Sequence, residues 1–230
     1  AEMTAGLRSG MFRFTYPKSD KAFIMIDMNY TLWQNCEWSN LRMENDSTLT
    51  GYKLVKGWGP ERHVYFTAVF SKKLKNLRIM QDKKLVIYNT SRFRSCYEAW
   101  GKNLMACISF AAEEGEEVIV KMSVSAVSTA GAMLNLQELN GMTFDALREK
   151  GVGLWEKELS KYQIEAKSEV KEAFYTAAYR AALHPFIFQD ADGQFRGLDK
   201  NIEKAEGFTN YTVFSLWDTY RALHPWFNLV

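Results

Sequence analysis

Hydrophobic and polar residues alternate with a period of two through most of the first 125 residues of the chain. The stretch SGMFRFTYP at 9–17 shows this alternation and closes on a proline. Further apolar runs follow at short intervals, at 21–30, 52–59, 62–71, 75–82, 104–112 and 116–128. Short runs of this kind, separated by Gly, Asn and Asp clusters, are typical of antiparallel sandwiches. We therefore predict an antiparallel β-sandwich, with hairpin turns at GKN (101–103) and EEGEE (113–117).

The strand expected at 116–128 has two faces of different character, because successive side chains of a strand point to opposite sides. One face carries the apolar residues Val118, Val120, Met122 and Val124. The other face carries Lys121, Ser123 and Ser125. The pattern predicts a strand with one side in the core and one side in water.

The period changes near residue 130, where apolar residues begin to recur every three or four positions. This predicts helices over 131–141 and 143–164, and a third over 168–185. Thr143 and Ser168 stand where a side chain that caps a helix N-terminus is expected. Helices that follow the strands, rather than alternate with them, indicate an α+β chain of more than one domain.

We predict a loop over 186–210, with QDADGQFRG at its centre. A last helix is predicted from Thr212 to His224. Pro225 is expected to end this helix, because the residue before a proline is pushed out of the α region.

Two of these helices share a short motif, YRAALHP at 179–185 and YRALHP at 220–225. The motif indicates either an evolutionary repeat or a chance similarity. In both cases amphipathic helices of this kind need about three repeats to bury their apolar faces. We therefore expect the helical region to be unfinished at Val230.

Composition narrows the possible classes of protein. Hydrophobic residues make up 47% of the 230 residues and charged residues 24%, which is an ordinary globular balance and excludes disorder of the whole chain. The net charge of +2 is too balanced to indicate a nucleic acid or an anionic membrane as partner. No run of 18 apolar residues exists, so no transmembrane segment is predicted. Aromatic residues reach 14%, which suits either a packed core or a cleft that stacks on sugars.

Three cysteines, Cys36, Cys96 and Cys107, match no metal or redox spacing. One disulfide is compatible with them, and small buried thiols are the alternative. The sequence leaves their disulfide status open.

The polar chemistry of the chain is densest in FSLWDTYRALHP at 214–225. On one helix, Arg221 would reach both Trp217 and Asp218, which lie four and three residues before it. One interpretation is a solvated Asp–Arg pair with Trp217 in the core, and such a pair contributes little to stability. The other places Trp217 and Asp218 in a pocket, where Asp218 accepts hydrogen bonds from substrate hydroxyls.

Two further groups of residues have side chains that can bind metal ions. Asp190, Asp192 and Asp199 resemble a calcium loop, but the glycine follows Asp192 directly and the EF-hand spacing fails. A turn stabilised by aspartate side chains is the better interpretation. His184 and His224 each precede a proline and lack a third ligand at a known spacing, so hydrogen-bonded histidines at helix ends are expected instead.

The stretches VKMSVSAVSTAGAMLNLQEL (120–139), FYTAAYRAALHPFIFQDADGQFRG (174–197) and NYTVFSLWDTYRALHP (210–225) resemble the glycoside hydrolase family 92 α-mannosidases. The resemblance implies an N-terminal β-sandwich, linker helices and an (α/α)6 catalytic barrel. Mapped onto this chain, the sandwich occupies 1–128, the linker helices 129–167 and the first barrel helices 168–230. The chain would then be an internal part of a longer, exported enzyme, inactive by itself.

The same resemblance implies an exo-acting, calcium-dependent enzyme that removes terminal mannose from glycans, with α-1,2 linkages as the expected target. Inversion uses one carboxylic acid on the leaving oxygen and one carboxylate that activates water, about 6.5–9.5 Å apart. Trp217 and Asp218 match the motif that lines the mannose pocket. No catalytic residue and no metal ligand is expected within this chain; those groups and the Ca²⁺ ligands would lie in the remainder of the enzyme.

Two other functions remain open from the sequence. One is a non-catalytic carbohydrate-binding or interaction module, a sandwich with a helical appendage. The other is a different (α/α)6 enzyme with a sandwich attached, such as a glycoside phosphorylase.

Overall fold

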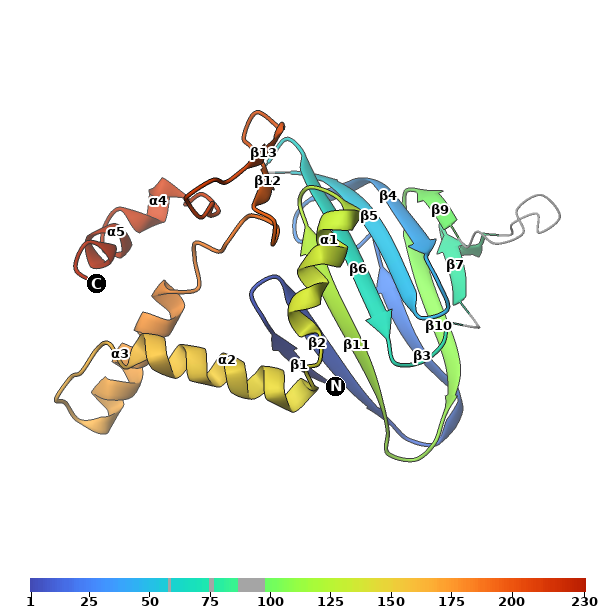
Figure 1. The fold of residues 1–230 in the computed structure, drawn as a ribbon, viewed down its shortest axis with the longest axis horizontal. Helices are drawn as coiled ribbons and strands as arrows, with labels where there is room; N and C mark the ends of the chain where they lie inside the picture. The colour runs from blue at the N-terminus through green and yellow to red at the C-terminus, as the bar shows by residue number, and fades with distance from the viewer. Residues whose placement is uncertain (58, 75–76, 87–97) are drawn as a thin grey trace.

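Two antiparallel sheets packed face to face form most of the molecule (Figure 1). The computed structural model describes residues 1–57, 59–74, 77–86 and 98–230. The larger sheet contains, in spatial order, β1 (Glu2–Ala5), β2 (Ser9–Tyr16), β11 (Glu116–Ser125), β6 (Arg62–Phe70), β5 (Thr48–Lys56), β4 (Asn35–Met43) and β9 (Glu98–Gly101). The smaller sheet contains β3 (Ser19–Asp27), β10 (Leu104–Ala112), β7 (Leu77–Gln81) and β8 (Lys84–Leu85). The predicted antiparallel sandwich is confirmed.

The hydrophobic core lies between the two sheets and follows the period-two pattern of the sequence. Leu41 and Leu49 of the larger sheet are completely buried. Ala106 and Ile108 of β10 face them from the smaller sheet, and both are also buried. Alternating apolar positions therefore build this core, as expected for a sandwich.

The predicted hairpins at 101–103 and 113–117 are wrong. The first segment connects β9 to β10 and the second connects β10 to β11, and in each case the two strands belong to different sheets. Both segments are therefore crossings from one sheet to the other. Gly115 adopts a φ of 75° in the second crossing, which glycine does without steric cost. A turn signal marks where a strand ends, but it does not say which strand the chain pairs with next.

The sequence pattern did not reveal β4 as a strand. Its interior carries Ser39 and Asn40, which are polar yet buried. Their side chains are satisfied within the sheet: Ser39 Oγ donates to the Gly101 carbonyl at 2.8 Å, and Asn40 Nδ2 donates to the Ala99 carbonyl at 3.1 Å. A register shift between Cys36 and Trp38 further disturbs the alternation.

Helix α1 (Thr129–Leu136) lies across the outer face of the larger sheet, over β11, β6 and β5 (Figure 1). The predicted wet face of β11 is therefore wrong in its second half. Ser123 is buried and its Oγ donates to the Ala132 carbonyl of α1 at 2.5 Å. Lys121 Nζ donates to the carbonyl oxygen of Leu139, in the short 3₁₀ helix η1 (Gln137–Leu139), at 3.1 Å. The polar face of this strand binds a helix rather than water.

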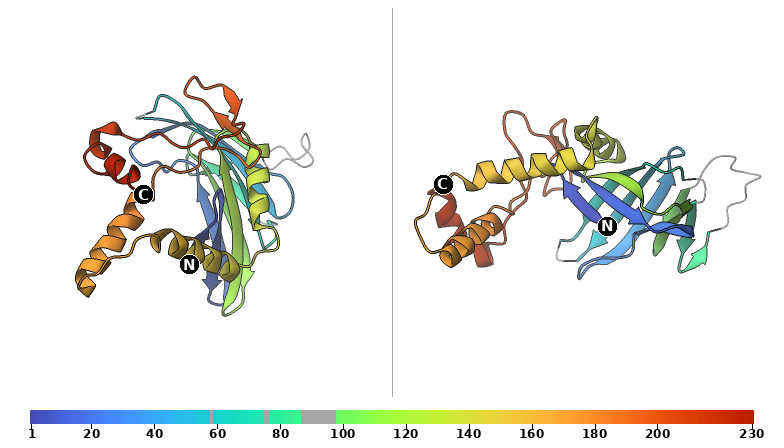
Figure 2. Two further views of the ribbon diagram at one scale, coloured as in Figure 1. Left: turned by 60° about the vertical axis from the view of Figure 1, so that its left-hand side comes forward. Right: turned by 90° about the horizontal axis from the view of Figure 1, so that it is seen from below.

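Four more helices follow, and the views in Figures 1 and 2 agree that α2 leads away from the sandwich toward the others. They are α2 (Phe144–Leu159), α3 (Ser168–Ala181), α4 (Leu216–Thr219) and α5 (Leu223–Phe227). Phe144 and Leu147 of α2 pack with Met11 of β2 in a second, smaller core. Thr143 caps α2 as predicted, accepting from the Ala146 amide at 3.2 Å. The predicted cap at Ser168 is wrong, because Lys167 is the N-cap of α3.

The single last helix predicted from Thr212 to His224 is also wrong. The chain forms α4 and α5 with a break between them, and Pro225 lies inside α5 instead of ending a helix. Proline is tolerated there because the amides of a helix's first turn have no partner within the helix. The two YR…LHP motifs consequently differ in structure: the first begins in the last turn of α3 and continues past its end, and the second spans the break and the start of α5.

The remaining expectations from the sequence have mixed outcomes. Cys36 and Cys107 are free thiols, whereas Cys96 lies outside the described residues. The domain boundaries at 128 and 167, and the assignment of the later helices to a barrel, stay predictions. Within the described part of the chain, no helix has the length and apolar character needed to span a membrane.

Gly51 provides a test of the sandwich. It lies opposite Phe66 in the pair of β5 and β6, and a Cβ atom there would stand 2.3 Å from the Phe66 ring and 2.7 Å from the Asn40 carbonyl oxygen. Because that oxygen belongs to the backbone, Gly51→Ala has to displace β4. We expect the free energy of unfolding to fall by about 1–3 kcal/mol, measured by urea denaturation.

Gly153→Ala is the matched control. Gly153 lies within α2, and an added Cβ would meet no atom within 4 Å. Alanine there should raise the free energy of unfolding by about 0.5–1 kcal/mol. A Gly51→Ala variant as stable as wild type would contradict the packing of β4 against β5 described above.

Candidate functional site

The candidate residues Trp217 and Asp218 lie on α4, a short helix near the C-terminus that stands away from the two sheets (Figure 1). The side chain of Trp217 is 86% exposed, and Asp218 is exposed as well. Among the described residues, no group donates a hydrogen bond to the Asp218 carboxylate. An open indole face and an adjacent carboxylate with free oxygens can together bind a polyhydroxy ligand.

The intrahelical pairing expected for Arg221 does not form. The break after α4 places Arg221 beyond the helix, and its Nε donates to the Tyr220 hydroxyl at 3.1 Å. The guanidinium also lies over the Tyr220 ring, 5.6 Å from its centre. Trp217 is not a core residue either. The interpretation as a solvated Asp–Arg pair beside a buried Trp217 is therefore wrong.

Phe214 fixes the start of α4 by packing between two histidines. The rings of His184 and His224 each lie 5.1 Å from the Phe214 ring, both edge to face. His184 Nε2 donates to the Val213 carbonyl at 3.0 Å, and His224 Nε2 is hydrogen-bonded to Thr219 Oγ1 at 2.8 Å. Both histidines are hydrogen-bonded near helix ends, as the sequence predicted.

Trp226 holds α5 from the other side. Its ring lies 5.0 Å from Tyr162 and 6.3 Å from Phe174, so it packs against the first part of the α2–α3 connection and against α3. Tyr175, also on α3, donates from its hydroxyl to the Tyr162 carbonyl at 2.8 Å. Aromatic packing therefore anchors the two short helices, which have too few residues to be stable alone.

The backbone before α4 is paired with the segment that follows α3. The Phe188 amide donates to the Asn210 carbonyl at 2.8 Å, and the Thr212 amide donates to the Phe186 carbonyl at 2.9 Å. Gln189 Oε1 accepts from the Asn210 amide at 2.6 Å. The predicted loop at 186–210 is thus more ordered than expected. It also contains a hairpin of β12 (Gln194–Arg196) and β13 (Ile202–Lys204).

Asp190 is the buried polar centre of this segment, with an exposed fraction of 3%. Its Oδ2 accepts from Ser125 Oγ at 2.6 Å, and its Oδ1 accepts from Asn135 Nδ2 at 2.7 Å. Burial raises the pKa of the Asp190 carboxyl, while the hydrogen bonds from Ser125 and Asn135 act in the opposite direction. The carboxylate therefore joins the later segment to the end of β11 and to α1.

The other aspartates of the motif stabilise turns, which confirms that interpretation of the sequence. Asp192 Oδ1 accepts from the Gln194 amide at 3.0 Å, and Asp199 Oδ1 accepts from the Asn201 amide at 3.0 Å. Gly193 has a φ of 88° within the first turn. No cluster of three His, Cys, Asp or Glu side chains suited to a metal ion occurs among the described residues.

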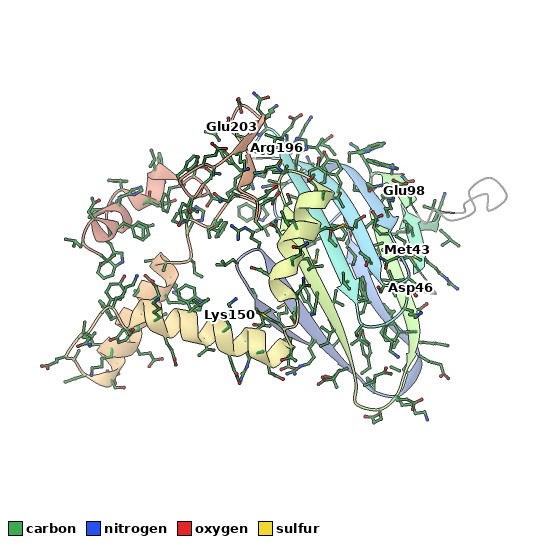
Figure 3. All side chains as sticks on the ribbon, viewed as in Figure 1. Met43, Asp46, Glu98, Lys150, Arg196 and Glu203 are labelled. Atoms are coloured by element: carbon green, nitrogen blue, oxygen red, sulfur yellow. The ribbon has the colours of Figure 1, made fainter. Side chains whose placement is uncertain are left out.

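Two arginines add hydrogen bonds between the segment 186–210 and the sandwich. Arg196 Nε donates to the Ala126 carbonyl at 3.0 Å, and Figure 3 shows Arg196 beside the start of α1. Arg8, in the turn between β1 and β2, donates from Nε to the Gln189 carbonyl at 2.7 Å. That turn is held in place by Glu138, whose Oε1 accepts from the Ser9 amide at 2.7 Å and from the Arg8 amide at 2.9 Å.

A hollow of about 710 Å³ lies between the β1–β2 hairpin, the end of β11 and residues 186–195. Its walls include Phe12, His63, Phe186 and Gln189. Trp217 and Asp218 do not line it. The hollow therefore marks the junction between sandwich and helical region, separate from the exposed candidate residues.

The sequence pointed to Trp217 and Asp218, whose role stays a prediction, but it did not reveal Asp190 as a buried partner of the sandwich. It also missed Phe214 as the residue between two histidines. A usable signal existed for Asp190: Gly131 in α1 leaves no room for a Cβ, which would stand 2.1 Å from Asp190 Oδ2. A glycine inside a helix indicates that another segment approaches closely, but it does not identify that segment.

Models of two domains match successive parts of this chain. The glycosyl hydrolase family 92 N-terminal domain matches residues 1–125, and the glycosyl hydrolase family 92 catalytic domain matches residues 131–230. No match is found among curated proteins.

Solved structures show the same relationship. The chain is 79% identical to the family GH92 α-mannosidase BT3965 from Bacteroides thetaiotaomicron, with a TM-score of 0.95, over 98% of this chain and 31% of that one. BT3965 has also been solved in complex with mannoimidazole. The inverting mannosidase BT2199 from B. thetaiotaomicron VPI-5482 shares the fold, at 21% identity and a TM-score of 0.82, over 98% of this chain and 30% of that one. The chain thus spans about a third of the length of the structures it matches.

Phe214 and Trp217 should differ in their effect on stability. Phe214→Ala removes the ring between the two histidines and should lower the free energy of unfolding by about 1–2 kcal/mol, because that ring is half-buried. Trp217→Ala should change it by less than about 0.5 kcal/mol, because the side chain is exposed. Urea denaturation measures both. Equal losses in the two variants would show that Phe214 does not anchor α4.

Proposed function

The chain belongs to glycosyl hydrolase family 92, and from this we propose that the protein is an exo-acting α-mannosidase that removes terminal mannose from glycans. The observation that carries the proposal is the 79% identity to an α-mannosidase over 98% of this chain. Because the chain spans 31% of that relative, the activity is proposed for the protein at its full natural length. We further propose α-1,2 linkages as the target and an exported location for the enzyme.

We propose that Trp217 and Asp218 contact the terminal mannose. The exposed indole offers an apolar face against which the C–H face of a pyranose can stack. The Asp218 carboxylate can accept hydrogen bonds from two adjacent hydroxyls, because its oxygens accept none within the described chain. These two residues bind and orient the sugar; they are not assigned proton transfer.

The proposed reaction is inverting and uses a carboxylic acid and a carboxylate about 6.5–9.5 Å apart. The exposed position of Asp218 suits hydrogen bonding to sugar hydroxyls. Both catalytic carboxyl groups are proposed to lie outside this chain. We also propose that α3, α4 and α5 are the first helices of an (α/α)6 barrel, which the match of residues 131–230 to the catalytic-domain model supports.

Calcium is the cofactor implied by the family resemblance. Among the described residues, no three His, Cys, Asp or Glu side chains converge. We propose from the resemblance that the calcium ligands lie outside this chain, and no step of the reaction is assigned to the ion.

Asp218→Ala tests the sugar-binding role in the protein at its full length. Hydrogen bonds to a charged group contribute about 1.5–3 kcal/mol, so we expect kcat/KM on an α-1,2-mannobiose to fall by about 10- to 100-fold. Glu172→Ala is the control, because Glu172 is an exposed carboxylate on the neighbouring α3. An unchanged kcat/KM in Asp218→Ala would remove this residue from the site. Turnover only with inorganic phosphate would identify a phosphorylase instead.

Metal removal tests the cofactor. Treatment of the full-length protein with EDTA should abolish mannose release, and added Ca²⁺ should restore it. The readout is released mannose before chelation, after chelation and after addition of Ca²⁺. Activity that survives thorough chelation would refute the calcium requirement and leave the assignment of Trp217 and Asp218 intact.

A further inference from the structure

The motif DADGQFRG at 190–197 has no part in the proposed sugar binding, yet it contains the most deeply buried carboxylate described above, that of Asp190. Its neighbours belong to the sandwich side of the chain. Ser125 ends β11, Asn135 lies in α1, and a Cβ added at Gly131 of α1 would stand 2.1 Å from Asp190 Oδ2. The motif is therefore a contact between two parts of the protein rather than a free loop.

Both side chains that contact the Asp190 carboxylate donate hydrogen bonds to it, so this position suits only a group with two acceptor oxygens. Ser125 Oγ accepts from the Val127 amide at 2.9 Å and from the Ser128 amide at 3.3 Å, which occupies both of its lone pairs, so its hydrogen is directed to Asp190. Asn135 Oδ1 accepts from the Ala191 amide at 2.8 Å, so its Nδ2 group faces Asp190. An asparagine at position 190 would place an N–H group against one of these two donors. The neighbours are thus fixed as donors, and a carboxylate is required.

The position of Asp190 is transmitted to α4 through a short and well-paired piece of backbone. Gln189, the residue before it, accepts from the Asn210 amide through Oε1 at 2.6 Å. The backbone of 186–188 then pairs with that of 210–212. Two residues later, Phe214 packs between the histidines at the start of α4. The steps from Asp190 to α4 are hydrogen bonds and ring contacts joined by short stretches of backbone.

We propose that Asp190 is a positioning residue for the sugar site: its carboxylate fixes the paired segments 186–189 and 210–213 to β11 and α1, and thereby sets where α4 presents Trp217 and Asp218. The proposal rests on the proposed function for what the site binds. Asp190 does not touch the sugar; it acts through the backbone. The sandwich accordingly takes part in substrate binding by locating α4.

The test uses Asp190→Asn in the protein at its full length, with Asp192→Asn as the matched control. Asp192 lies in the same turn but is bonded only to Gln194 among the described residues. We expect kcat/KM on an α-1,2-mannobiose to fall at least about tenfold in Asp190→Asn, because small displacements of binding groups are costly. KM should rise, and Asp192→Asn should match wild type.

Hydrogen–deuterium exchange supplies a readout that does not depend on turnover. In folded Asp190→Asn, amides of 210–219 should exchange at least about tenfold faster, while those of β3 and β10 should be unchanged. If the wild-type protein released no mannose, the proposed function would fail, and this comparison would still decide whether Asp190 fixes α4. Unchanged exchange at 210–219 and unchanged kcat/KM in the folded variant would reduce Asp190 to a purely structural role and overturn the proposal.

Gly131→Ala approaches the same contact from the sandwich side. The new Cβ would stand 2.1 Å from Asp190 Oδ2 and 2.8 Å from Ser125 Oγ, so it displaces the carboxylate while the sequence of 186–213 stays unchanged. We expect a loss of kcat/KM similar to that of Asp190→Asn, and a double variant no worse than the more impaired single one. Losses that multiply in the double variant would show independent effects and contradict the proposed mechanism. Gly153→Ala, in the open part of α2, serves as the control.

Discussion

The buried carboxylate of Asp190 is the constraint on which the arrangement of the molecule depends. A carboxylate taken out of water costs several kcal/mol unless other groups replace its hydrogen bonds. Here Ser125 and Asn135 do so, and both belong to the sandwich side of the chain. Because these donors are fixed by their own bonds to the backbone, only one placement of the later segment satisfies all of them. The position of residues 186–213, and of α4 beyond them, follows from this requirement.

The outer face of the larger sheet, together with α1, supplies the hydrogen-bond partners that Asp190 requires. Strand β11 exposes serines and a lysine on the side where an isolated strand would meet water, and α1 with η1 uses them as hydrogen-bond partners. The same region offers backbone amides to Glu138 and backbone carbonyls to Arg196. A polar strand face can thus act as a docking surface for helices and irregular backbone, provided that each buried group finds a partner. The apolar face of the sheets supplies the stability, and the polar face supplies the geometry.

The two short helices of the candidate site are stabilised by aromatic packing, whereas Asp190 sets their position. Helices α4 and α5 are too short to persist alone, and aromatic packing around Phe214 and Trp226 holds them. This packing leaves Trp217 and Asp218 free of internal partners, which a binding surface requires. The sequence pointed to these two residues by their chemistry and by family resemblance. It could not foresee the break after α4, because the local periodicity of 212–224 agrees with a continuous helix, and tertiary packing overrides that preference.

By itself the sequence determined the sandwich, the change to helices near residue 130 and the cap at Thr143; its assignment of Trp217 and Asp218 to a sugar site stays a prediction. These features depend on local periodicity and on side-chain type, which a single chain displays directly. Only the tertiary structure decided that the turns at 101–103 and 113–117 cross between sheets, that Ser39 and Asn40 form part of a strand, and that Asp190 binds the sandwich. Each of these involves partners far apart in the sequence, up to 65 residues for Asp190 and Ser125. The physical reason is that the sequence pattern predicts a polar residue to be exposed unless its hydrogen-bond partner is known, and the fold determines which residue that partner is.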